Sequence, residues 1–259
     1  MSCIRRGAVL LSFLSISFAF FSGCTAGRVK VSDSECRGLT ASADGYLDQG
    51  DREYDRRNIE GALESYKKAL CREPESVSVH LSLSLTLGAL GRTEEALAHT
   101  DYILTDLKPG SIEALTNKGL ILQRAGRYGE ARKIHEEILV RRPSSGPALL
   151  NLGLVEYQMG NEEEAIRRFE AFIQRYPREV MGLANLAAIY SGRGEFAKAE
   201  ELFNRSLRVD PDDYATHQNL ANHYVRREEF GLAYKHYSRA CDLGLPRACE
   251  DARWARNQQ

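Results

Sequence analysis

The stretch from residue 180 to residue 213 shows two successive helical patterns of apolar positions. Four residues recur at i, i+3, i+4 and i+7, the spacing that shares one face of a helix: Leu183, Leu186, Ala187 and Tyr190. A glycine-containing turn at residues 191–194 then interrupts the pattern. A second stripe starts at Phe196 and stops before Pro211, because the residue ahead of a proline is disfavoured in the helical conformation. The stretch therefore predicts an antiparallel pair of helices.

Three series of residues repeat along the chain with a common interval of 34 or 35 residues. Six of the seven prolines form the first series: Pro74, Pro109, Pro143, Pro177, Pro211 and Pro246. Alanines form the second: Ala62, Ala96, Ala131, Ala165, Ala199 and Ala233. Small residues form the third: Gly50, Ser84, Gly119, Gly153, Ala187 and Ala221. One shared period indicates that residues 43–247 are a single helix pair copied six times. One pair cannot bury both of its faces, so the copies must stack, and the sequence predicts an all-α solenoid.

The repeated pattern resembles the tetratricopeptide repeat, whose signature is W-x2-L-G-x2-Y, then A-x3-F, then P. The fourth copy matches it with Leu149, Leu152, Gly153, Ala165, Phe169 and Pro177. The fifth copy matches it with Leu183, Leu186, Ala187, Tyr190, Ala199, Phe203 and Pro211. The resemblance implies a right-handed superhelical solenoid of six repeats, at residues 43–76, 77–111, 112–145, 146–179, 180–213 and 214–247. Residues 248–259 are expected to form a capping helix and tail.

Two copies depart from the pattern. The second has Ser84 where glycine is expected, Thr100 at the aromatic position and one extra residue before Pro109. The third has Lys118 at the usual leucine and His135 at the aromatic position. We expect looser packing or a slight bend at these copies, without a change of fold.

The amino terminus reads as a signal peptide over residues 1–23. Arg5 and Arg6 precede an apolar stretch that is too short to span a bilayer, where roughly 20 residues are needed. The sequence Phe-Ser-Gly-Cys that ends at Cys24 resembles a bacterial lipobox. This resemblance implies that Cys24 is lipidated, with palmitate among its acyl chains, and becomes the first mature residue. The alternative is an ordinary signal peptide in which Cys24 is only a nearby thiol.

A lipidated Cys24 would anchor the chain to a membrane through residues 24–42, which are small and polar and read as a flexible tether. Thr25 stands where an aspartate would favour the inner membrane in enterobacterial lipoproteins. We therefore expect a bacterial outer-membrane lipoprotein that faces the periplasm, or a cell-membrane one if the source has a single membrane.

Four cysteines remain in the mature chain after Cys24: Cys36, Cys71, Cys241 and Cys249. An even number in an exported chain favours disulfides. The segment around Cys241 resembles the Sel1-like relatives of the repeat, which implies a Cys241–Cys249 bridge. Cys36–Cys71 would then pin the tether to the first repeat. The alternative is four reduced or buried thiols.

Charge and motif content argue against several functions. Removal of Arg5 and Arg6 with the leader leaves 33 basic residues against 36 acidic ones, without a basic patch, so nucleic acid is not an expected partner. No metalloprotease, serine-hydrolase or phosphate-loop motif is present, so we expect neither an enzyme nor a cofactor. His217 and His223 lie about 240° apart on a helix, and with His236 they are expected to pack rather than to bind a metal.

A column of carboxamides is predicted on the first helices of the copies. Its members follow one another at intervals of 34 residues: Asn117, Asn151, Asn185 and Asn219. First helices line the inner surface of such a superhelix, where carboxamides can bond the backbone of an extended peptide. The column resembles the asparagine ladder of the sugar transferase that modifies intracellular proteins. Asparagine is also common here in the repeat consensus, which is the structural alternative.

Apolar residues are expected beside the column: Leu81, Leu85, Leu120, Leu150, Leu154, Tyr157 and Met181. An apolar groove suits an amphipathic helix or a hydrophobic tail of a partner. Packing between adjacent pairs would account for the same residues.

The sequence as a whole favours a membrane-anchored scaffold that binds another envelope protein. Its layout looks like the pilotin lipoproteins of type IV pili, which help the secretin to assemble. An adaptor for peptidoglycan hydrolases and a non-catalytic peptide- or solute-capture lipoprotein are the alternatives.

Overall fold

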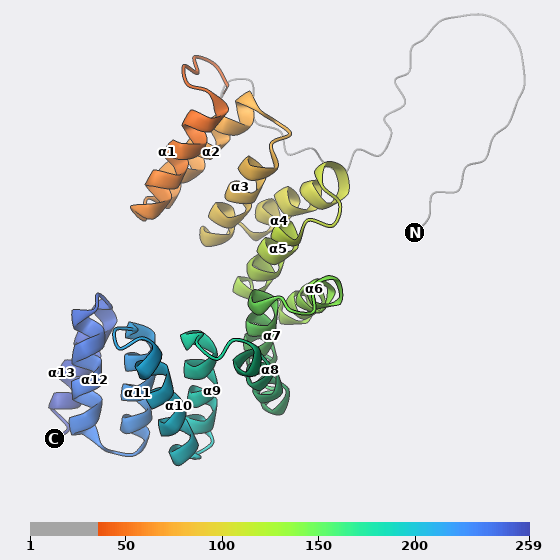
Figure 1. Cartoon of the computed structure of the whole chain (residues 1–259). Coiled ribbons are helices and arrows are strands. Elements are labelled where there is room, and N and C mark those ends of the chain that lie inside the picture. Colours follow the sequence, from red (N-terminus) through yellow and green to blue (C-terminus); the bar gives the residue numbers. More distant parts are fainter. Residues whose placement is uncertain (1–35) are drawn as a thin grey trace, which may run out of the picture.

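The computed structural model describes residues 36–259, which fold into thirteen α-helices and one short π-helix and contain no strand (Figure 1). The first helices of six successive pairs are α1 (Ala43–Asp55), α3 (Val77–Ala89), α5 (Ile112–Arg124), α7 (Gly146–Gln158), α9 (Val180–Gly192) and α11 (Tyr214–Arg226). The second helices are α2 (Ile59–Arg72), α4 (Thr93–Tyr102), α6 (Tyr128–Arg141), α8 (Glu162–Arg175), α10 (Phe196–Val209) and α12 (Phe230–Asp242). A final helix, α13 (Pro246–Arg256), packs on α12. The all-α repeat fold expected from the sequence is confirmed.

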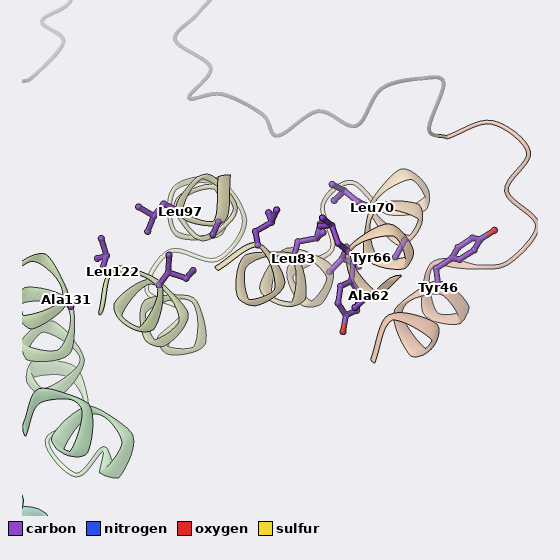
Figure 2. Packing of buried hydrophobic residues seen from close by; sticks show 14 of the residues in the cluster. Tyr46, Ala62, Tyr66, Leu70, Leu83, Leu97, Leu122 and Ala131 are labelled. Atoms are coloured by element: carbon purple, nitrogen blue, oxygen red, sulfur yellow. The ribbon is translucent and has the colours of Figure 1, made fainter. Parts of the chain in front are cut away.

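The pairs stack in chain order into a curved array, with α1 and α13 at its two ends and α7 near its middle (Figure 1). Each second helix packs on its own first helix and on the first helix of the next pair. Apolar burial therefore runs continuously from pair to pair. Figure 2 shows this for one cluster, which takes one labelled residue from each of the helices α1 to α5: Tyr46, Tyr66, Leu83, Leu97 and Leu122.

Small residues let the two helices of a pair approach closely. A Cβ atom built on Gly50 would lie 2.3 Å from the ring of Tyr66, and one on Gly153 would lie 2.9 Å from the ring of Phe169. The alanines of the repeated series are all fully buried where the helices cross. A larger side chain at these positions would push the helix axes apart.

The extra residue of the second copy is taken up by a single π turn, η1 (Ile103–Leu107), that continues α4. The amide of Lys108 donates to the carbonyl of Ile103 over 2.7 Å, a span of five residues instead of four. The insertion thus changes the end of one helix and leaves the repeat order intact.

The segment before the first helix is held against the first pair. Cys36 and Cys71 form a disulfide with a Cα–Cα distance of 5.4 Å, and Arg72 donates to the carbonyl of Leu39 over 2.6 Å. The amide of Thr40 donates to the hydroxyl of Tyr46 over 3.1 Å. Residues 36–42, which the sequence placed in the flexible tether, are therefore fixed to α1 and α2. The expected signal peptide and the lipidation site Cys24 lie outside the described residues.

The last helix closes the other end of the array. Cys241 and Cys249 form a disulfide that joins α12 to α13, with a Cα–Cα distance of 4.8 Å. Three alanines of α13 are buried against the last pair: Ala248, Ala252 and Ala255. Trp254 is 46% exposed and meets Phe230 edge-on. Across residues 36–259, no helix is both long and apolar enough to cross a bilayer.

Candidate functional site

The first carboxamide of the predicted column is bonded inside the protein. Asn117 is 9% exposed, and its amide donates to the carbonyl of Leu81 over 3.2 Å and to the hydroxyl of Ser84 over 3.1 Å. Ser84 is the residue that replaces the expected glycine in the second copy. These bonds join α3 to α5, so Asn117 serves the stacking of two pairs.

The other three carboxamides are available at the surface. Asn151, Asn185 and Asn219 are partly exposed, and their side chains make no hydrogen bond to any residue in the described range 36–259. Each therefore has two donors and an acceptor free for another chain. The usable part of the column lies on α7, α9 and α11.

The predicted apolar residues divide into two groups. Leu150 is 7% exposed and belongs to the core around α8, so it packs between pairs and does not reach the groove. Four leucines are half-buried on the first helices of the second, third and fourth pairs: Leu81, Leu85, Leu120 and Leu154. Tyr157 is 43% exposed and Met181 is 58% exposed. The accessible apolar surface thus lies on α3, α5, α7 and the start of α9.

Tyr157 on α7 and Met181 on α9 are exposed at the joint between the fourth and fifth pairs. The ring of Phe172 stands between the beginnings of these helices: a Cβ built on Gly146 would lie 3.6 Å from it, and one on Gly182 would lie 2.4 Å from it. As a result α9 packs on α8 and α11 but scarcely touches α7. At the following joint the equivalent residues are small, and α9 and α11 are in contact.

An acidic stripe on α1 was missed when the sequence was read for function. Its members are spaced by four, three and four residues: Asp44, Asp48, Asp51 and Asp55. All four are exposed. Asp51 accepts a hydrogen bond from the hydroxyl of Tyr66 over 2.7 Å, and burial together with this carboxylate raises the pKa of Tyr66. The helical spacing of the aspartates was the available signal.

Two pairs of histidines were also missed. The Nδ1 atoms of His80 and His99 lie 2.7 Å apart, and those of His217 and His236 lie 3.0 Å apart. In the first pair, Nε2 of His80 lies 2.9 Å from the carbonyl of Pro74. A carbonyl only accepts, so Nε2 carries the proton and Nδ1 of His80 accepts from His99. Burial, with a contribution from His80, lowers the pKa of His99 to about 3.

The second pair repeats this arrangement with Nε2 of His217 at 3.0 Å from the carbonyl of Pro211. Burial and the neighbouring His217 lower the pKa of His236 to about 4. Both pairs join the two helices of one repeat to the loop before it. The second pair contains His217 and His236, whereas His223, the third histidine named from the sequence, lies with Nδ1 3.1 Å from the hydroxyl of Ser191. Residues 36–259 hold no cluster of three potential metal ligands.

His135 occupies the aromatic position of the third copy without any polar partner. It is fully buried, and neither ring nitrogen has a hydrogen-bond partner. A Cβ built on Gly119 would lie 2.6 Å from its ring, so the imidazole fills the place that Phe169 takes in the next copy. Burial lowers the pKa of His135 to about 4.

Family models described as tetratricopeptide repeat match four overlapping parts of the chain, residues 47–112, 110–178, 144–212 and 184–252. Among solved structures, the array is similar to a tetratricopeptide repeat protein from Parabacteroides merdae. The TM-score is 0.72 and the identity 21%, over 82% of this chain and 84% of that one.

Two further structures share the architecture. PilF of Pseudomonas aeruginosa has a TM-score of 0.61 and 19% identity, over 84% of this chain and 97% of that one. TTC0263 of Thermus thermophilus has a TM-score of 0.61 and 18% identity, over 71% of this chain and 99% of that one. At these identities the similarity establishes the fold. No curated protein sequence matches the chain significantly.

Proposed function

Because the chain belongs to the tetratricopeptide repeat family, we propose that it is a lipid-anchored scaffold that binds another protein of the bacterial envelope. Arrays of this family are protein–protein interaction scaffolds that take peptide segments on their concave side. The observation that carries the proposal is the concave surface itself. The first helices α7 and α9 carry the free carboxamides of Asn151 and Asn185 and the exposed side chains of Tyr157 and Met181.

The mixture of groups suits a peptide or an amphipathic helix. Free carboxamides can bond a peptide backbone whatever its sequence, and half-buried leucines gain when a partner's apolar side chains exclude water. No part of this role requires catalysis or a cofactor. The partner's segment is held by side chains of the first helices alone.

Attachment to a membrane through Cys24 completes the proposal. Because the disulfide at Cys36 fixes the chain to the first pair, only the residues between Cys24 and Cys36 can act as a linker. At about 3.5 Å per residue this linker reaches roughly 40 Å when extended. The array would then work close to the membrane surface, on the periplasmic side of an outer membrane. The lipobox-like sequence that ends at Cys24 supports this location.

The partner that we favour is the secretin of type IV pili, which this chain would help to assemble in a pilotin-like role. Two observations support it. The layout of a lipobox followed by six repeats looks like that of pilotin lipoproteins, and the array covers 97% of the PilF chain. This support comes from the order of segments along the chain, because no single residue identifies a secretin as the partner.

Site-specific photo-crosslinking in intact envelopes tests the proposal. A photoreactive residue at Tyr157, on the concave side, is expected to capture one envelope protein. The matched control carries it at Val140, which is 83% exposed on the second helix α6. Capture at both positions, or at neither, would contradict a concave binding site. The Cys24→Ser variant should leave the membrane fraction, and its retention there would contradict the lipid anchor.

Deletion of the gene separates the proposed machine from the adaptor alternative. Loss of secretin multimers and of twitching motility supports the pilotin-like role. A change of cell shape, or lysis at low salt, would instead support an adaptor for peptidoglycan hydrolases and overturn the pilotin-like role.

A further inference from the structure

We propose that the segment bound on the concave face carries basic residues at one end and apolar residues after them, with its basic end on α1. This inference rests on the proposed function and specifies the partner's chemistry. It follows from one row of positions that runs along the first helices of all six pairs.

The row is defined by the 34- or 35-residue period. Its members, from the first pair to the sixth, are Asp51, Leu85, Leu120, Leu154, Ala188 and Asn222. The row thus begins with a carboxylate, continues through three leucines that are half-buried, and ends with a small residue and a carboxamide. A partner that matches this row must place a cationic group first and apolar groups next.

The acidic stripe enlarges the anionic end of the row. Asp44, Asp48, Asp51 and Asp55 fall within a sector of about 60° on α1 at 100° per residue. None of them forms an ion pair with a residue of the described chain, 36–259. Four carboxylates therefore face solvent together at one end of the concave surface.

Only part of the stripe serves the stability of the first pair. Asp44 lies in the first turn of α1, where a carboxylate is favourable, and Asp51 accepts a hydrogen bond from Tyr66. Like charges four residues apart, as at Asp44 and Asp48 or Asp51 and Asp55, destabilise a helix. Asp55 is also the last residue of α1, where the partial negative charge of the helix end disfavours a carboxylate. Local interactions thus leave Asp48 and Asp55 unexplained, whereas a cationic partner would relieve both the repulsion and the unfavourable helix end.

Some exposed carboxylates elsewhere are paired between neighbouring repeats. Glu94 bonds Arg127 over 3.0 Å, and Glu163 bonds Arg193 over 2.7 Å. These bridges balance the charge where one pair meets the next. The stripe on α1 has no such bridge within residues 36–259, and it gathers four carboxylates on one face of a single helix.

The apolar part of the row gives the partner its second requirement. Leu85, Leu120 and Leu154 keep part of their surface in water, and Tyr157 lies exposed one turn beyond Leu154. Burial of such surface against a partner's apolar side chains is favourable because it removes the surface from water. A purely basic segment would leave these side chains uncovered, and a purely apolar one would leave the carboxylates without a partner.

Fluorescence anisotropy with the full chain in detergent tests the inference, using three labelled synthetic peptides. The first has a lysine-rich half followed by a half with regularly spaced leucines. The second replaces its lysines by glutamates, and the third replaces its leucines by serines. The first peptide is expected to bind at least tenfold more tightly than either of the others, and more weakly as salt is raised.

A triple variant, Asp44→Asn with Asp48→Asn and Asp55→Asn, should weaken binding of the first peptide about tenfold and flatten its salt dependence. The matched control removes three exposed carboxylates from other helices: Glu201→Gln, Asp242→Asn and Glu250→Gln. It should bind as the unaltered protein does. These substitutions are at the surface, and circular dichroism verifies that each variant is folded.

Equal binding of the lysine and glutamate peptides, equal effects of the two triple variants, or no binding of any peptide would each overturn the inference. The crosslinking from Tyr157 separates this failure from failure of the proposed function. A concave crosslink to an envelope protein with no preference for the basic peptide overturns the inference alone. Absence of that crosslink overturns both.

Discussion

Gly182 lies so close under the ring of Phe172 that a Cβ atom on it would stand 2.4 Å from Cδ1 of the phenylalanine. This contact lies at the joint between α8 and α9. One pair later the same two positions hold Ser206 and Thr216, whose hydroxyl oxygens lie 2.9 Å apart. The two residues that meet at each of these joints thus differ in size together: the large ring of Phe172 faces a glycine, whereas two small hydroxyl residues face each other at the next joint.

Gly182→Ala should lower the free energy of unfolding by about 1–3 kcal/mol, because the added methyl group overlaps a buried ring that cannot move freely. Denaturant unfolding measures the change. Adding Phe172→Leu should restore part of the loss. The control is Gly192→Ala in the same helix, where no atom lies within 4 Å of the new Cβ. That variant should be neutral or slightly stabilised, and an equal loss in both would contradict the steric account.

His135→Phe should raise the free energy of unfolding, because the imidazole buries two unpartnered nitrogens at a position that Phe169 fills in the next copy. An unsatisfied buried polar group costs about 1–3 kcal/mol, so a gain of that order is expected. Denaturant unfolding at neutral pH gives the value. A less stable variant would show that the site cannot accept a phenyl ring.

The same substitution should change how stability depends on pH. The pKa of His135 is lowered to about 4 in the folded chain, against about 6.5 when unfolded. Between these values the unfolded state binds more protons, so the stabilisation is complete above pH 6.5 and is lost as the pH falls toward 4. His135→Phe removes this loss. Its advantage over the unaltered protein should widen by about 2 kcal/mol from pH 7.5 to pH 5. A constant difference would contradict the lowered pKa.

The histidine pairs should show fixed tautomers. Long-range ¹H–¹⁵N spectra at pH 6 are expected to find His80 protonated on Nε2 and His99 on Nδ1, since the carbonyl of Pro74 accepts from Nε2 of His80. Both rings should be neutral there, because burial lowers the pKa of each. His99→Leu should remove the donor to His80 and destabilise the protein by about 1–3 kcal/mol. An imidazolium pattern at pH 6 would contradict the arrangement.

Alkylation of the unreduced protein should add no mass at the four cysteines that the two disulfides join. Opening the short loop with Cys249→Ser should destabilise the final pair by about 2–3 kcal/mol, because the crosslink restricts the unfolded chain. Hydrogen exchange in α12 and α13 measures this locally, and α3 provides the internal reference. Faster exchange throughout the chain would contradict a local effect.

The repeat period predicted most of the architecture because it acts on positions that every copy must share. Pro177, Ala165 and Gly153 occupy such positions, so each could be assigned to a boundary or a helix crossing without coordinates. The contacts of residues outside the repeat signature could not be predicted in this way. Phe172 and Gly182 lie only ten residues apart, yet their contact depends on how α8 packs on α9, which the repeat signature does not specify.

The candidate site was predicted less completely, because its side chains make hydrogen bonds to residues of other helices and other repeats. The column was expected to be uniform, but Asn117 is bonded to Ser84, a hydroxyl 33 residues earlier in the chain. His80 and His99 come from antiparallel helices, and only the crossing geometry brings their Nδ1 atoms together. The aspartates of α1 needed no coordinates and were visible as a helical stripe.

The bridge between Cys36 and Cys71 has a mechanical consequence. Tension on the chain ahead of Cys36 passes through the sulfur atoms directly into the end of α2, so α1 carries no load and cannot be peeled away first. The bridge between Cys241 and Cys249 likewise carries a pull on α13 past residues 242–248 and into the last turn of α12. A pulling force thus enters the array at α2 and at α12, and the terminal helix α1 lies outside the path of the load.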